Sequence, residues 1–298
     1  MKNLLIVGCG DVVRRILPQL SKRWRVIALV RRRDEELSRL GVVQICGDLD
    51  QRDTLRRLAG IADAVIHSAP PPPNGTDDPR TRRLIACLQQ RKSVPRHLVY
   101  ISTSGVYGNC EGAMVPETRP LAASSARAKR RVSAEQQLRD FGKRGGRYRA
   151  CRISILRAPG IYAADRLPLD RVRQRLPLIA ANEDSYTNHI HAKDLGRACI
   201  AALRHGRSNR SYNINDDSGL AMGEWFDLLA DNFKLPRAPR LSRAQAATEL
   251  SPTQWSFAGE SRRLINTRMK RELGLHLAYP TVHSGIGRAP ESETTCSG

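Results

Sequence analysis

Two glycines near the start of the chain occupy positions that suit phosphate binding. The segment Gly8-Cys9-Gly10-Asp11-Val12-Val13 follows an apolar run and opens a stretch with helical spacing. In such a strand–turn–helix, the first glycine permits a tight turn, and the second lets a pyrophosphate approach the amino end of the helix. The third glycine of this pattern, which allows close packing of helix and strand, is replaced by Val13. The segment predicts a dinucleotide-binding turn with an incomplete pattern; a tight turn without a ligand is the alternative.

Arginines stand at the end of the next apolar run. The run 26–30 leads directly into Arg31-Arg32-Arg33. An acidic residue there would bind the ribose 2′-hydroxyl of NAD, whereas arginine pairs with the 2′-phosphate of NADP. Arg31 and Arg32 therefore favour NADP over NAD, with solvated loop arginines as the alternative. After the following run, Asp48 and Leu49 suit an adenine contact, and a helix cap explains Asp48 equally well.

These residues need a parallel sheet to bring them together. Apolar runs alternate with longer amphipathic stretches through the first half of the chain, which is the βαβ pattern. The expected strands are 3–7, 25–30, 42–46, 63–67, 97–102, 148–156 and 211–214, and the expected helices are 12–20, 51–58, 80–90, 126–141, 191–203 and 222–233. We therefore predict an α/β fold with a Rossmann-type, doubly wound parallel sheet.

The alternation stops after residue 214. We expect residues 1–165, completed by 190–215, to form an NAD(P)-binding Rossmann domain. Residues 216–284 are expected to form a small C-terminal substrate lobe over the carboxyl edge of the sheet. The small and polar stretch 285–298 is expected to be a flexible tail.

Composition excludes several classes of protein. No apolar run in the 298 residues reaches the roughly 18–20 residues of a membrane helix. The seven cysteines are scattered and contain no CxxC pair, which indicates a reducing compartment rather than a disulfide framework or zinc ribbon. We therefore expect a cytoplasmic protein that is neither membrane-bound nor secreted.

The chain is strongly basic. Its 50 lysines and arginines, 42 of them arginines, exceed its 29 acidic residues, and the formal net charge is +21. Helix-turn-helix, zinc-finger and RNP-type patterns are lacking, so nucleic-acid binding is not favoured. A small anionic molecule is the better partner, because the guanidinium fork matches phosphate oxygens.

Several segments, taken in order, resemble the extended short-chain dehydrogenase/reductases, the NAD-dependent epimerase/dehydratase family. The resemblance covers about residues 1–215, and the small lobe matches only loosely. The matching segments are Val65-Ile66-His67-Ser68-Ala69, Tyr100-Ile101-Ser102-Thr103-Ser104-Gly105-Val106-Tyr107-Gly108, Leu156-Arg157-Ala158-Pro159-Gly160-Ile161-Tyr162, Asn188-His189-Ile190-His191-Ala192-Lys193-Asp194-Leu195 and Tyr212-Asn213-Ile214.

The resemblance assigns roles to individual residues. The family's Ser or Thr that hydrogen-bonds the reacting oxygen falls on Thr103. The family's Tyr-x-x-x-Lys pair, aligned through Glu135, falls on Arg127 and Arg131, which resembles the atypical branch of the family. Arginine stays protonated above pH 12 and cannot shuttle a proton near neutrality. If hydride transfer survives, another group such as Tyr107 or Tyr162 must supply the proton. Alternatively, Arg127 binds a substrate phosphate or carboxylate, or stabilises an oxyanion electrostatically.

The resemblance also implies cofactor contacts from residues beyond the glycine turn, namely Ala69, Pro70, Ser102 and Pro159. His189, His191 and Asp194 have a spacing that suits a metal, but the family pattern explains them as a structural turn, so we expect no metal. A monomer or a homodimer through 80–90 and 126–141 is expected. The predicted function is an NAD(P)-binding oxidoreductase or epimerase-like enzyme for a small polar or anionic metabolite. The alternative is a non-catalytic redox sensor or assembly factor.

Overall fold

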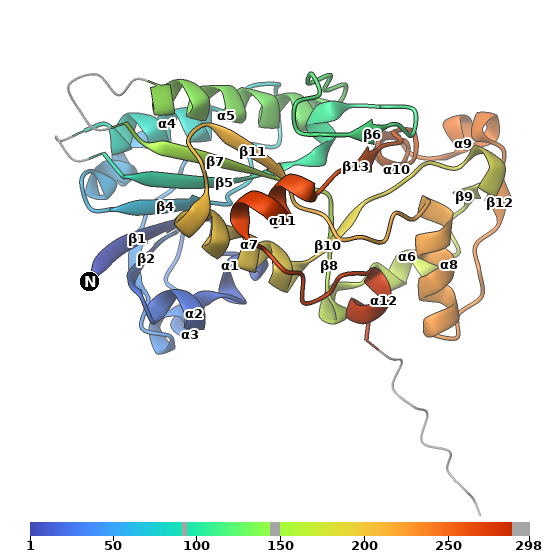
Figure 1. Cartoon of the computed structure of the whole chain (residues 1–298), viewed down its shortest axis with the longest axis horizontal. Coiled ribbons are helices and arrows are strands. Elements are labelled where there is room, and N and C mark those ends of the chain that lie inside the picture. The colour runs from blue at the N-terminus through green and yellow to red at the C-terminus, as the bar shows by residue number, and fades with distance from the viewer. Residues whose placement is uncertain (91–93, 144–149, 288–298) are drawn as a thin grey trace, which may run out of the picture.

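Seven parallel strands form one sheet in the computed structural model, which describes residues 1–90, 94–143 and 150–287 (Figure 1). The strands are β1 (Lys2–Val7), β2 (Trp24–Val30), β3 (Val43–Cys46), β4 (Ala64–His67), β5 (His97–Thr103), β7 (Arg152–Ala158) and β11 (Arg210–Asn213). They lie in the order β11-β7-β5-β4-β1-β2-β3. The strand order reverses between β1 and β4, so the predicted Rossmann-type, doubly wound sheet is confirmed.

Helices cover both faces of this sheet (Figure 1). One face carries α1 (Asp11–Arg14), α2 (Leu17–Ser21), α3 (Glu35–Arg39), α7 (Ala192–His205) and α11 (Thr267–Leu273), and the other carries η1 (Arg52–Leu58), α4 (Pro79–Leu88) and α5 (Ala126–Lys143). Successive side chains of a strand point to opposite faces. In β1, Leu4 and Ile6 therefore enter the first core, and Leu5 and Val7 enter the second.

The sequence pattern does not predict α3, and the elements that it does predict are found as expected except in three places. The strand expected over 148–156 is β7, which starts later; residues 148 and 149 lie outside the described residues. The helix expected over 12–20 is wrong as one element, because Pro18 has no amide hydrogen to continue the ladder from α1 into α2. The helix expected over 51–58 is the 3₁₀ helix η1.

A smaller lobe packs at the carboxyl edge of the sheet (Figure 1). Its short strands are β8 (Gly160–Tyr162) paired with β10 (His189–His191), and β9 (Leu178–Ile179) paired with β12 (Arg240–Leu241). Its helical elements are η3 (Ala164–Arg166), α6 (Leu169–Arg173), η4 (Ala181–Glu183), α8 (Met222–Asn232), α9 (Arg243–Glu249), α10 (Pro252–Ala258) and α12 (Val282–Gly285). Tyr162 and Val172 share one core with Trp225 and Leu229, so residues before 216 contribute to this lobe.

The chain returns from the lobe to the sheet before it ends. The strand pair β6 (Met114–Val115) and β13 (Arg263–Leu264) joins the two regions. After it, Met269, Leu273 and Leu275 enter the same core as α7. The expected tail 285–298 begins too early, because Gly285 ends α12 and Ile286 is buried in the lobe core; residues 288–298 lie outside the described residues. None of the described helices is long and apolar enough to cross a membrane.

Candidate cofactor and reaction site

The turn after β1 leaves open space on the side of Gly10. Gly8 has a φ of +92°, and a Cβ there would lie 2.3 Å from the Ala69 nitrogen. Any side chain on Gly8 would therefore collide with the backbone that follows β4. A Cβ on Gly10 would meet no atom within 4 Å. Gly8 is thus required by the fold, whereas Gly10 keeps space clear beside the first amides of α1, which have no intrahelical acceptors.

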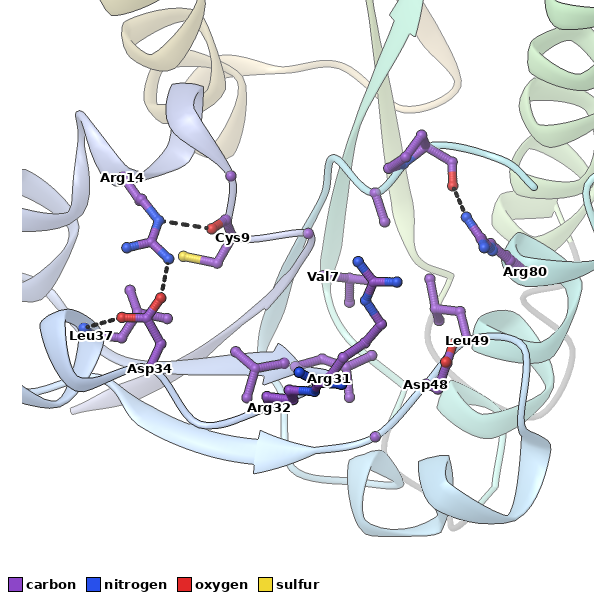
Figure 2. Close-up of a pocket in the computed structure, with 17 residues that line it drawn as sticks. Val7, Cys9, Arg14, Arg31, Arg32, Asp34, Leu37, Asp48, Leu49 and Arg80 are labelled. Atoms are coloured by element: carbon purple, nitrogen blue, oxygen red, sulfur yellow. Dashed lines mark hydrogen bonds and ion pairs between the residues drawn. The ribbon is translucent and has the colours of Figure 1, made fainter. Parts of the chain in front are cut away.

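A hollow of about 400 Å³ opens beside this turn, at the ends of β1 to β4 (Figure 2). Open α/β sheets bind their ligands at this point, where the strand order reverses. The hollow has the open glycine turn and the cationic rim that suit the phosphate groups of a dinucleotide. The predicted cofactor-binding residues that line it are Gly8, Gly10, Arg31, Arg32, Asp48, Leu49, Ala69 and Pro70.

Arg80 also lines the hollow, although the sequence pattern does not single it out. Its Nε donates to Asp50 at 2.9 Å, and its Nη1 donates to the Pro70 carbonyl at 3.1 Å. The bond from Arg80 holds the pKa of the Asp50 carboxyl below its usual range. Arg80 therefore ties the loop after β4 to the loop after β3. The pattern hides this role because residues 50, 70 and 80 meet only in the folded sheet.

Arg14 is a second lining residue that the pattern does not single out. It lies four residues after Gly10 and thus on the same face of the helical turn, which is the signal that would find it. Its Nε donates to the Cys9 carbonyl at 3.2 Å. Its two terminal nitrogens pair with Asp34 and Glu36 (Figure 2 shows Asp34). The bond from Arg14 lowers the pKa of Asp34.

Five other predicted cofactor residues, Asp11, Val12, Val13, Ser102 and Pro159, are not among those that line the hollow. The Asp11 carboxylate accepts bonds from Arg15 at 2.9 Å and from Arg166 at 2.7 Å. Val13, at the third glycine position, is buried in the core. Close packing at this helix comes instead from α7, where a Cβ on Gly196 would lie 2.6 Å from Ile16.

Thr103, the residue predicted to hold the reacting oxygen, ends β5 and caps η2 (Ser104–Tyr107). Its Oγ1 accepts a hydrogen bond from the Gly105 amide at 3.3 Å. The hydroxyl hydrogen has no acceptor among the described residues, and the side chain is half-buried. Thr103 is therefore free to donate a hydrogen bond to a ligand at the end of β5.

Tyr107, in contrast, has both sides of its hydroxyl engaged. The hydroxyl donates to Asn213 Oδ1 at 2.7 Å and accepts from Arg157 Nη1 at 2.8 Å. Arg157 also pairs with Glu135 at 2.7 Å, and Ser102 donates to the same carboxylate at 2.7 Å. Burial raises the pKa of Tyr107. This placement favours a structural role for Tyr107 and for Ser102.

The two arginines at the expected Tyr and Lys positions differ in their surroundings. Arg131 Nη1 donates to the Tyr100 hydroxyl at 2.9 Å and to the Ile101 carbonyl at 2.8 Å, so it anchors α5 to β5. Arg127 is exposed, and its guanidinium carbon lies 4.1 Å from the ring centroid of Phe257 in the lobe. Of these two arginines, Arg127 is therefore the exposed one, and it reaches from α5 to the lobe.

The residues beyond β11 border a second hollow of about 310 Å³. Asp216 is 3% exposed there, and its Oδ2 has no hydrogen-bond partner among the described residues. Burial raises the pKa of Asp216 to about 7.

The two histidines of the expected turn contact aromatic rings. His189 lies 4.5 Å from Trp225, and His191 lies 3.6 Å from Tyr279, as measured between ring centroids. His191 also caps α7 through its Nδ1, at 3.2 Å from the Lys193 amide. Within the part of the chain that the structure describes, no three His, Cys, Asp or Glu side chains gather as a metal site would require.

Comparison with known proteins adds to this geometry. Residues 5–215 match the NAD dependent epimerase/dehydratase family. A solved protein from Silicibacter pomeroyi DSS, described as conserved and functionally unknown, is 27% identical; the match covers 96% of this chain and 97% of that chain, with a TM-score of 0.78. No curated protein matches the chain.

Two structures with assigned activities are similar in fold. UDP-glucose 4-epimerase from Thermotoga maritima, solved with UDP-glucose, is 17% identical, with a TM-score of 0.76 over 95% of this chain and 96% of that chain. The dTDP-glucose 4,6-dehydratase from Streptomyces venezuelae, solved with NAD, is 19% identical, with a TM-score of 0.72 over 95% of this chain and 94% of that chain.

Proposed function

Because the chain belongs to the NAD-dependent epimerase/dehydratase family, we propose that it is an NADP-dependent oxidoreductase or epimerase-like enzyme for a small anionic metabolite. The observation that carries the proposal is the hollow beside Gly10, which is bordered by Arg31 and Arg32. A nicotinamide dinucleotide bound there supplies hydride transfer. The glycine turn and the loops after β2, β3 and β4 hold and orient it.

The preference for NADP over NAD rests on the rim of this hollow. Arg31 and Arg32 are exposed at the end of β2, where the adenosine ribose of a dinucleotide binds in this fold. Their guanidinium groups match the oxygens of a 2′-phosphate. The two nearby arginines that also line the hollow, Arg14 and Arg80, are already engaged by carboxylates.

We assign Thr103 to hold the reacting oxygen and Arg127 to hold an anionic group of the substrate. Thr103 has a hydroxyl hydrogen without an acceptor among the described residues, and its Oγ1 accepts a hydrogen bond from the Gly105 amide. Arg127 has Arg130 and Arg262 within electrostatic range, with Glu260 as their acidic neighbour. This excess of positive charge favours an anionic metabolite over a neutral one.

The Tyr-x-x-x-Lys pair, which transfers the proton in the family, is absent when the chain is aligned through Glu135. No tyrosine of the sequence is followed by a lysine four residues later. Arg131 is bonded to Tyr100 and Ile101, and arginine does not release its proton near neutrality. We infer that the proton reaches the oxygen held by Thr103 from water.

Calorimetric titration with NADPH and, separately, with NADH tests the cofactor. We expect tighter binding of NADPH and at least a tenfold loss when Arg31 and Arg32 are both replaced by Ala. The control is Arg39→Ala, which removes an exposed cation at the end of α3 and should leave NADPH binding unchanged. Equal affinity for NADPH and NADH would overturn the NADP assignment.

A turnover assay tests whether the protein is an enzyme. A screen of phosphorylated and carboxylated carbonyl compounds and alcohols follows NADPH or NADP⁺ absorbance. Arg127→Ala should lower turnover at least tenfold and spare NADPH binding, whereas Lys129→Ala on the same helix should change neither. Bound NADPH that no compound consumes would favour the alternative of a non-catalytic dinucleotide-binding sensor or assembly factor.

A further inference from the structure

Two acidic residues stand beside the hollow at the place where a 2′-phosphate is expected. Asp34 lines the hollow and caps α3, and Glu36 follows in the first turn of that helix. The Leu37 amide donates to the Asp34 carboxylate at 3.2 Å. Gln44 fixes the Asp34 backbone, because its side chain bonds the Asp34 amide at 2.8 Å and the Asp34 carbonyl at 2.7 Å. The Asp34 carboxylate is therefore held in place by the start of α3.

Such carboxylates oppose NADP binding. A phosphate monoester carries up to two negative charges, so an uncompensated carboxylate nearby repels it. A free carboxylate at this end of the hollow would also accept a hydrogen bond from a ribose 2′-hydroxyl and so favour NAD. Arg31 and Arg32 alone would then have to overcome both acidic groups.

Arg14 removes this conflict. It reaches across from the glycine turn, and its guanidinium pairs with both Asp34 and Glu36. Its Nε donates to the Cys9 carbonyl; Figure 2 shows this bond and the pair with Asp34. The pair raises the pKa of Arg14 and lowers the pKa of Asp34, so both groups stay charged and matched. The side chains of Arg14 and Asp34 are each 29% exposed, whereas that of Glu36 is 65% exposed, so solvent screens the pair with Asp34 less than the pair with Glu36.

We propose that Arg14 is a specificity-determining residue, which sets the preference for NADP by neutralising Asp34 and Glu36. This inference rests on the proposed function, since it concerns the same hollow and the same class of cofactor. Arg31 and Arg32 attract the 2′-phosphate of NADP. Arg14 pairs with the carboxylates of Asp34 and Glu36, which would otherwise accept a hydrogen bond from the 2′-hydroxyl of NAD.

The test is the ratio of NADH to NADPH dissociation constants, measured by calorimetry on the full chain. Arg14→Met should lower this ratio at least tenfold, through weaker NADPH binding and unchanged or tighter NADH binding. In the matched control Arg39→Met, a cation on α3 paired only with Glu35 among the described residues is removed, and the ratio should stay within twofold. A ratio that falls equally in both variants would overturn the inference, because it would reflect net charge alone.

A rescue separates neutralisation from mere packing. Adding Asp34→Asn and Glu36→Gln to Arg14→Met should restore most of the ratio, since asparagine still caps α3 and no acid remains to be neutralised. Failure to restore the ratio would overturn the inference. If Arg14→Met does not fold, Asp34→Asn alone serves: it removes one of the two carboxylates that Arg14 neutralises and should raise the ratio, and an unchanged ratio would contradict the role of Asp34.

Different results would overturn the proposed function and the inference about Arg14. A wild-type chain that binds neither dinucleotide overturns the proposed function and the inference together. A wild-type chain that prefers NADPH, with a preference that survives Arg14→Met, leaves the proposed function standing and overturns only the role of Arg14.

Discussion

The carboxyl edge of the sheet has two ends that use their polar side chains in opposite ways. At the end of β1 and β2, the glycine turn and Arg31 border an open hollow. At the end of β5 and β7, Glu135, Arg157 and Tyr107 bond one another in a buried network. The first end leaves Arg31 and Arg32 exposed, whereas the second, apart from Thr103, uses its polar groups to hold strands and helices together. A substitution at one end can therefore alter the proposed ligand site without touching the buried network at the other end.

We call the end at β1 and β2 the open end, and the end at β5 and β7 the closed end. The largest effect on stability is expected at the closed end. Glu135→Ala leaves the buried Arg157 charge without its partner, and we expect the free energy of unfolding to fall by about 3–5 kcal/mol. Urea denaturation measures this loss. Glu35→Ala, which removes the exposed partner of Arg39, is the control and should cost less than about 0.5 kcal/mol. Similar losses in both variants would show that the network is not what stabilises this end.

At the open end, Gly8→Ala should be the most damaging change. Its Cβ would collide with the Ala69 backbone, and its φ of +92° strains any residue with a side chain. We expect a loss of about 3 kcal/mol in stability, together with loss of NADPH binding. Thermal unfolding and calorimetry on the same sample check the two effects, and a stable variant that still binds NADPH would contradict the geometry of the turn.

Asp216 is the exception at the closed end, because one of its oxygens is buried without a partner among the described residues. Its folded pKa is raised to about 7, so the folded chain keeps a proton that the unfolded chain loses above about pH 4. Stability attributable to this group therefore falls as pH rises from about 4 to 7, and levels off above 7. The Asp216→Asn variant has no carboxyl group to ionise at this position, so its stability should not fall with pH in this way.

The advantage of Asp216→Asn over the wild type should grow by roughly 2–3 kcal/mol between pH 5 and pH 8. Urea denaturation of both proteins at the two pH values measures it. A difference that does not depend on pH would mean that Asp216 titrates as an ordinary aspartate.

Gly10→Ala should have the smallest effect on stability and the clearest effect on the ligand. Its Cβ meets no protein atom within 4 Å, and its φ of −90° suits alanine. We expect stability to change by less than about 0.5 kcal/mol. NADPH binding should weaken at least tenfold, because the new methyl group enters the space beside the first amides of α1. Unchanged binding would place the phosphates elsewhere.

The sequence predicts the sheet and the open end well for a physical reason. Gly8, Gly10, Arg31 and Asp48 all follow apolar runs directly, and the carboxyl ends of parallel strands meet at one edge. Residue order therefore indicates which side chains gather there. The same rule finds Thr103 at the end of β5.

The rest depends on contacts that residue order does not encode. Arg14 and Arg80 lie on helices, and their roles appear only when residues 34, 36 and 50 are brought beside them. The two hydrogen bonds of the Tyr107 hydroxyl likewise involve Arg157 and Asn213, which come from β7 and β11. The break between α1 and α2 could have been predicted, because Pro18 stands inside the expected helix.

The return of the chain to the sheet has a consequence for biosynthesis. Met269, Leu273 and Leu275 complete a core that otherwise consists of residues 4–214. The region that forms the sheet therefore has to wait, during translation, for a segment that emerges after most of the lobe. At ribosomal rates this delay is on the order of 10 s, during which one face of the sheet is only partly covered. Premature termination just after residue 214 would release a chain with every strand of the sheet and an unfinished core.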